Sequence, residues 1–157
     1  MNIHIAGYSI SSNYKKTKLF YSKGAYITNA CKCNYCKNYC LACDYLDLST
    51  KILFRSFGIN PKKEAEVWHL FEDDDGFHHY SVFYHFSGKI INGPPFWIEH
   101  SKEVSTPNFV KFNNIGIGFT ESISISPRSL AEPIVQLEIE LSMPWLLKKL
   151  PLEENTK

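Results

Sequence analysis

The sequence predicts a single-domain α+β protein in which a short helical hairpin packs on a mostly antiparallel β-sheet that is curved or two-layered. Segments with helical spacing lie in the first third of the chain, whereas alternating, strand-like segments follow one another from residue 64 onward. Strands gathered after helices argue against a doubly wound parallel sheet. The 157 residues contain no linker or internal repeat, which predicts one domain over residues 1–157, with 152–157 as a frayed tail.

The first segments predict a strand pair followed by a helix. The stretches TKLFYS and AYIT flank Lys23 and Gly24, a pattern typical of a short β-hairpin. After a cysteine-rich loop, Asn34 is a candidate N-cap, and apolar residues then recur at helical spacing. The shared face of this helix comprises Tyr35, Tyr39, Cys40, Cys43 and Leu46.

Residues 48–57 predict a second helix with a marked end. Ser49 is its candidate N-cap. Gly58 can adopt the left-handed conformation that ends a helix, Ile59 is placed to fold back onto it, and Pro61 prevents continuation. The apolar stripe comprises Leu48, Ile52, Leu53 and Phe57.

From Glu64 onward the apolar period changes to two, which predicts strands. EVWHLF and FHHYSVFYHF flank the acidic turn EDDDG and should pair as a long hairpin, and the Gly93–Pro95 break should lie in a loop or at a sheet edge. Further alternation is seen in residues 115–119 and at Ile123 and Ile125.

The segment VQLEIEL is the clearest strand. Its apolar residues Val135, Leu137, Ile139 and Leu141 are expected to face inward, and its polar residues Gln136, Glu138 and Glu140 are expected to face water. Pro144 should end the strand. Residues 145–147 should then dock on the body of the fold.

Composition and charge exclude several classes of function. The net charge is +1, so the basic surface that nucleic-acid binding requires is not expected. No apolar run approaches the roughly 20 residues of a membrane span. The segment MNIHIAGYSI lacks the basic and apolar regions of a secretory signal. We therefore expect a cytoplasmic protein with reduced thiols, without nucleic-acid or membrane partners, and with a protein partner left open.

All five cysteines lie between residues 31 and 43, in the pattern C-x-C-x2-C-x3-C-x2-C. Cys31, Cys33 and Cys36 lie close enough in sequence to bind one zinc ion, with Cys40 or a histidine from the sheet as the fourth ligand. Familiar structural zinc sites join two separated cysteine pairs, and this sequence has no second, distant pair. The histidines on or beside predicted strands are His69, His78, His79, His85 and His100.

Two other uses of these thiols stay open. Cys33 and Cys36 are spaced like a redox pair at a helix N-terminus, although the βαβ context of thioredoxin-like proteins is missing. All of the cysteines can equally be small apolar residues of the fold, and Cys40 and Cys43, on the apolar helix face, are interpreted in that way. Structural packing and metal binding are close alternatives for the other three.

Several segments, taken in this order, resemble a family of uncharacterised bacterial proteins. They are CKCNYCKNY at 31–39, FGINPKKEAEV at 57–67, YHFSGKIINGP at 84–94, GFTES at 118–122 and PIVQLEIELSMPWLL at 133–147. The resemblance implies a shared C-x-C-x2-C-x-N motif and a C-terminal segment of the PWLL type, whereas Cys40 and Cys43 look like additions. It implies no activity and no catalytic or binding residue.

These observations favour an intracellular binding or interaction module in which Cys31, Cys33 and Cys36 hold a structural zinc. No catalytic motif is present, so an enzyme is not the preferred class. One alternative is a thiol-based redox enzyme or sensor that uses Cys33 and Cys36. Another is an immunity-type protein that binds a partner through its sheet or aromatic surface, with purely structural cysteines.

Overall fold

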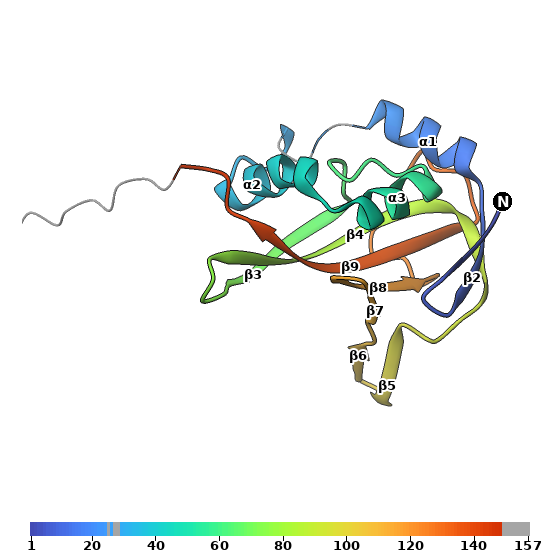
Figure 1. The fold of residues 1–157 in the computed structure, drawn as a ribbon. Coiled ribbons are helices and arrows are strands. Elements are labelled where there is room, and N and C mark those ends of the chain that lie inside the picture. The colour runs from blue at the N-terminus through green and yellow to red at the C-terminus, as the bar shows by residue number, and fades with distance from the viewer. Residues whose placement is uncertain (25, 27–28, 149–157) are drawn as a thin grey trace, which may run out of the picture.

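The computed structural model describes residues 1–24, 26 and 29–148, and it confirms the α+β class. Three α-helices of this part of the chain lie on one face of an antiparallel sheet (Figure 1). They are α1 (Tyr14–Lys23), α2 (Asn34–Ala42) and α3 (Leu48–Phe57), with a 3-10 turn, η2 (Cys43–Tyr45), after α2. The sheet is open, and it is not a closed barrel.

The main sheet has seven strands in the order β1-β2-β4-β9-β8-β7, with β3 also paired to β4. A separate two-stranded sheet, β5-β6, projects from the side opposite the helices (Figure 1). The strands are β1 (Asn2–Ile5), β2 (Tyr8–Ser12), β3 (Glu66–Glu72), β4 (Phe77–Asn92), β5 (Trp97–Ser101), β6 (Val104–Pro107), β7 (Val110–Phe112), β8 (Ile115–Thr120) and β9 (Ile134–Pro144).

Strand β4 organises the sheet because it is long enough to pair with three other strands. One edge pairs with β9 from Phe77 to Ser87, and the other pairs first with β3 and then with β2. The predicted β3–β4 hairpin and the break after Asn92 are therefore confirmed.

The core lies between the helices and the sheet, and aromatic rings fill it. Tyr39 of α2 packs on Tyr80 with ring centroids 5.3 Å apart, and Phe54 of α3 packs on Tyr84 at 4.9 Å. Offset and edge-on packing of this kind adds about 0.5–1.5 kcal/mol per pair to the burial of the rings. The abundance of Phe and Tyr is thus explained by the core.

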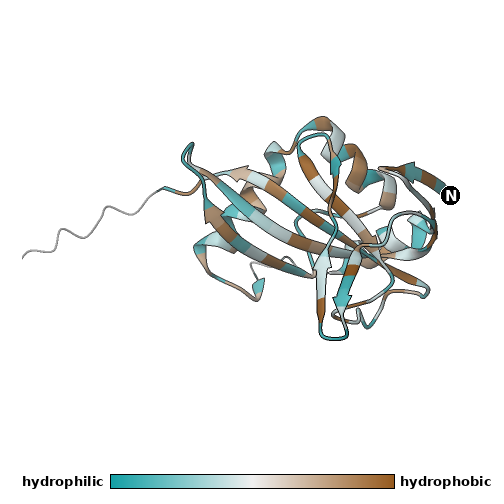
Figure 2. Cartoon of the chain, turned by 90° about the horizontal axis from the view of Figure 1, so that it is seen from below, coloured by the Kyte–Doolittle hydropathy of each residue, from teal (hydrophilic) through white to brown (hydrophobic). Residues whose placement is uncertain are grey.

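The second face of the sheet differs from the expectation. Gln136 and Glu138 were expected to face water, yet both are buried, and only Glu140 is exposed. The chain before β9 covers this face, since Ser124 donates its backbone N–H to the Gln136 side chain at 3.0 Å. The Gln136 amide in turn donates to Glu138. Figure 2 views this face, where hydrophobic and hydrophilic segments alternate along the strands.

The start of the chain also differs from the expectation. The predicted hairpin around Lys23 and Gly24 is wrong, because residues 14–23 form helix α1. Its N-cap is Asn13, whose side chain accepts a hydrogen bond from the backbone N–H of Lys16 at 3.2 Å. Thr17 and Tyr21, one turn apart, are its buried residues, so the segment has helical rather than alternating periodicity.

Helix α3 has the predicted end, but it starts earlier than the predicted cap implies. Gly58 has φ 78°, and Ile59 donates its N–H to the Phe54 carbonyl at 2.9 Å, which closes the helix as expected. The N-cap is Asp47 rather than Ser49. Two members of the predicted stripe, Leu48 and Ile52, are exposed, because the helix buries only its Leu53 side.

The expectations for the C-terminal third of the chain are confirmed in part. Val135, Leu137, Ile139 and Leu141 face the core, and β9 ends at Pro144, as predicted. The alternation at Ile123 and Ile125 is not part of a strand. The predicted frayed tail, residues 152–157, lies outside the described residues.

Candidate metal centre

The cysteine cluster lies where an extended loop becomes helix α2. Cys33 is the N-cap of α2, with φ −66° and ψ 155°, and its Sγ accepts a hydrogen bond from the backbone N–H of Cys36 at 3.4 Å. The expected N-cap, Asn34, is the first helical residue instead. A sulfur that accepts from the third residue of the helix performs the role that Ser or Asp usually performs at this position.

The helix start brings the first three thiols together. The Cys31 thiol donates to Cys33 Sγ with the sulfurs 3.3 Å apart, and the Sγ atoms of Cys31, Cys33 and Cys36 all lie within 4.8 Å of one another. The three cysteines are free thiols. Tetrahedral zinc with Zn–S bonds of about 2.3 Å places its sulfurs about 3.8 Å apart. The three thiols therefore lie close enough to bind a metal ion.

The expected fourth ligand is not in this group. Within the described part of the chain, the group contains neither Cys40 nor a histidine. Cys43 is buried in the core as expected, with its thiol 3.6 Å from the Pro61 carbonyl. Cys40 is half-buried, and burial raises the pKa of its thiol. The predicted core position is therefore confirmed for Cys43, whereas Cys40 lies at the edge of the core.

Two of the clustered thiols, Cys33 and Cys36, have pKa values shifted in opposite directions. Burial alone would raise the pKa of Cys33, but hydrogen bonds from the Cys36 backbone and the Cys31 thiol outweigh it and lower that pKa. Burial raises the pKa of Cys36, and its hydrogen bonds with the thiols of Cys31 and Cys33 raise it further. Of these two thiols, Cys33 is thus the one whose surroundings favour the thiolate.

A cavity of about 550 Å³ opens beside Cys33. Its aromatic walls are Tyr35, from the first turn of α2, and Trp145, which follows β9. Trp145 lies against His78 of β4 with ring centroids 4.4 Å apart and meets Tyr35 edge-on at 5.9 Å. The complete lining is Cys33, Asn34, Tyr35, Glu72, His78, Trp145 and Lys148.

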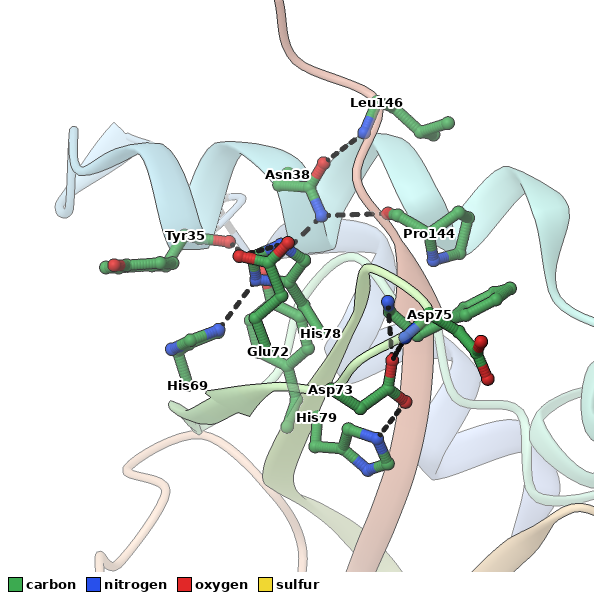
Figure 3. Close-up of polar contacts among 12 residues, drawn as sticks. Tyr35, Asn38, His69, Glu72, Asp73, Asp75, His78, His79, Pro144 and Leu146 are labelled. Atoms are coloured by element: carbon green, nitrogen blue, oxygen red, sulfur yellow. Dashed lines mark hydrogen bonds and ion pairs between the residues drawn. The ribbon is translucent and has the colours of Figure 1, made fainter. Parts of the chain in front are cut away.

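A pair of histidines supports one side of this cavity. His69 Nε2 and His78 Nδ1 are 2.8 Å apart, and Figure 3 shows the two rings beside Glu72. His78 is buried, and its Nε2 lies 3.8 Å from the Glu72 carboxylate. Tyr35 stacks on His69 at 4.1 Å. Burial lowers the pKa of His69, and the neighbouring His78 lowers it further, so the surroundings of His69 favour its neutral ring.

Asn38 anchors the segment after β9 that carries the cavity residue Trp145. Its side chain is fully buried, donates to the Pro144 carbonyl at 3.0 Å and accepts from the backbone N–H of Leu146 at 2.7 Å (Figure 3). The two contacts flank Trp145 in sequence and hold it on the body of the fold, as expected for this segment. Asn38 has no role in the predictions from the sequence; the signal that marks it is its position one turn before Ala42, on the face that α2 buries.

The other candidate histidines have ordinary structural partners. His79 bonds Asp73 at 2.8 Å, which ties it to the acidic turn. His85 is buried and bonds Gln136 at 3.0 Å, and His100 bonds Thr106 at 2.7 Å. These three do not contribute to the thiol group.

No protein-family model matches this chain, and comparisons with curated proteins and with solved structures found no match. The family resemblance therefore stays a prediction, and the site is interpreted from its own geometry. Among the described helices, none has the length and apolar character needed to cross a membrane.

Proposed function

We propose that this protein is a binding module whose cysteine cluster holds a zinc ion on Cys31, Cys33 and Cys36. The observation that carries the proposal is the approach of three free thiols to within 4.8 Å at the start of α2. Thiolates are soft ligands that favour zinc among the common divalent ions. A reducing compartment, which the sequence predicts, would keep them available.

Three protein ligands leave one coordination position of tetrahedral zinc for a water molecule or a bound group. Cys33 belongs both to the thiol group and to the lining of the 550 Å³ cavity. A molecule in this cavity, between Tyr35 and Trp145, would therefore lie next to the metal. This arrangement favours a ligand-binding role over a purely structural one.

Zinc would also organise the loop before α2. Cys31 lies outside the helix, Cys33 caps it and Cys36 lies inside its first turn. A metal bound to all three would join the loop to the helix start, and its binding free energy would add to the stability of that region.

The first prediction is that the purified, reduced protein contains one zinc per chain, measured by elemental analysis. With zinc bound, Cys31, Cys33 and Cys36 should resist a thiol reagent, and chelation should make three further thiols reactive. Cys33→Ser should lower zinc affinity by at least about 100-fold, since a ligand is lost. Cys40→Ser is the matched control and should retain full zinc content. Absence of bound metal together with freely reactive thiols would end the proposal.

A redox role is the second candidate. The spacing in the sequence pairs Cys33 with Cys36, whereas the short contact between Cys31 and Cys33 favours Cys31 as the partner. Their sulfurs are 3.3 Å apart, and Cys33 is the thiol with the lowered pKa. In this case Cys33 should react much faster than the other cysteines in the metal-free protein. The rate of Cys33 modification measured against pH tests the redox role, because an unperturbed thiol has a pKa of about 8.5. A midpoint below that value supports the redox role, and a midpoint at or above it contradicts the role.

A further inference from the structure

Strand β3 forms an edge of the main sheet. It pairs with β4 on one side, and no strand of the described residues pairs with its other side. The pairing is regular from Glu66 to His69 and shifts register between His69 and Phe71. The backbone of residues 66–69 therefore offers a short row of hydrogen-bonding groups to an added strand.

Large apolar side chains are exposed along this edge. Trp68 and Phe71, which point away from the helices, are 47% and 52% exposed, and Leu70 between them is 48% exposed. Trp68 lies beside the buried Phe83 of β4, with ring centroids 5.6 Å apart, while almost half of its own surface stays exposed. Several exposed apolar groups on one strand indicate an interaction surface more strongly than the same groups scattered singly.

Apart from histidines, the charged side chains of β3 and of its turn to β4 are all acidic. Residues 64–88 and 133–147 contain no lysine or arginine. Glu66, Asp74 and Asp75 form no ion pair with any lysine or arginine that the structure describes. Glu140, two strands from Trp68 in the same row, is also exposed.

We infer that the outer edge of β3 binds an extended, positively charged segment of a protein partner. Such a segment would add a strand beside residues 66–69. An arginine next to Trp68 would stack on the open side of the indole, where cation–π contact is favourable. The neighbouring Glu66 carboxylate would attract the same side chain.

The acidic charge favours a basic segment over a second copy of this chain as the partner of β3. Two copies paired through β3 would bring two acidic hairpins edge to edge, and the like charges would repel. An acidic or neutral segment would gain the backbone pairing without the electrostatic attraction. This inference does not depend on metal binding.

The test uses two fluorescent eight-residue peptides, one alternating arginine with valine and one alternating glutamate with valine. We expect the arginine peptide to bind at least about tenfold more tightly, to weaken as salt rises, and to slow hydrogen exchange of the β3 amides. Equal binding of the two peptides, or self-association through β3 without peptide binding, would overturn the inference.

Variants place the binding on β3. Trp68→Ala should weaken arginine-peptide binding at least about fivefold, and Glu66→Gln about twofold to threefold, because stacking and one carboxylate are lost. Trp97→Ala on β5 is the control for Trp68→Ala, since Trp97 is 40% exposed, and Glu99→Gln, which replaces an exposed carboxylate of β5, is the control for Glu66→Gln. Both control variants should bind like the unchanged protein. If Trp68→Ala unfolds, Glu66→Gln still tests the proposed site. Unchanged peptide affinity in Glu66→Gln, together with β3 amides that the peptide does not protect from exchange, would refute the site.

Discussion

Glu64 is a carboxyl group buried in the core without a hydrogen-bonding partner among the described residues. It is 7% exposed, and neither carboxylate oxygen is paired. Its charge acts on Tyr39, Tyr84 and Cys43, whose pKa values it helps to raise after burial. A carboxylate in such surroundings costs free energy unless it takes up a proton.

The second prediction concerns this residue and pH. Burial raises the pKa of Glu64 from 4.5 to about 7, so the folded chain binds the proton more tightly than the unfolded chain. The stability due to the protonated group is fully present below about pH 4.5 and is lost as pH rises through 7, a change on the order of 3 kcal/mol. Urea denaturation with a chelator present should show this loss between pH 5 and pH 8.

Glu64→Gln should remove most of that pH dependence and make the protein more stable than the parent at pH 8. Glu103→Gln, which replaces an exposed carboxylate in the β5–β6 turn, is the control and should leave the profile unchanged. A glutamine variant with the parental pH profile would show that Glu64 is not the group responsible.

At the scale of single elements, Asn38 connects helix α2 to the end of β9. Its amide forms hydrogen bonds with the Pro144 carbonyl and the Leu146 N–H, so one side chain holds both sides of Trp145. Trp145, which these two bonds flank, lines the cavity beside Cys33.

The third prediction is that Asn38→Ala destabilises the protein by about 2 kcal/mol, because two partly buried backbone groups lose their partner. The free energy of unfolding in urea is the measurement. Asn34→Ala, at an exposed position of the same helix, is the matched control. A loss below about 0.5 kcal/mol in Asn38→Ala, within the range of an ordinary surface change, would contradict the assigned role.

Elements whose signals are local could be predicted from the sequence. The end of α3 at Gly58 and the β3–β4 hairpin depend on residues within a few positions of one another, and both are confirmed. The three thiols are also local, since six residues span them. Helix α1 was missed because its cap, Asn13, precedes a segment with few buried residues, so the apolar pattern gave little evidence of the helix.

At the scale of the whole molecule, packing between distant segments decided what the sequence could not predict. Gly118 lies under the Phe96 ring, so close that an added Cβ would be 2.1 Å from a ring carbon. Gln136 is buried because the segment around Ser124 bonds it. The pattern VQLEIEL predicts that one face of strand β9 is exposed to solvent. Only the position of residues 93–133 in the fold shows that this face is partly covered.

The fourth prediction follows from the shared core of helices and sheet. The rings of Phe54 and Phe57 in α3 contact Tyr84 and Phe86 of β4. Detachment of α3 would therefore expose the buried rings of the sheet to water. We expect urea to unfold the described fold in one cooperative transition, with coincident midpoints by far-ultraviolet circular dichroism and by tryptophan fluorescence. Phe54→Leu should lower both midpoints equally, because it weakens the common core. Separate midpoints would mean that the helical layer and the sheet are independent units.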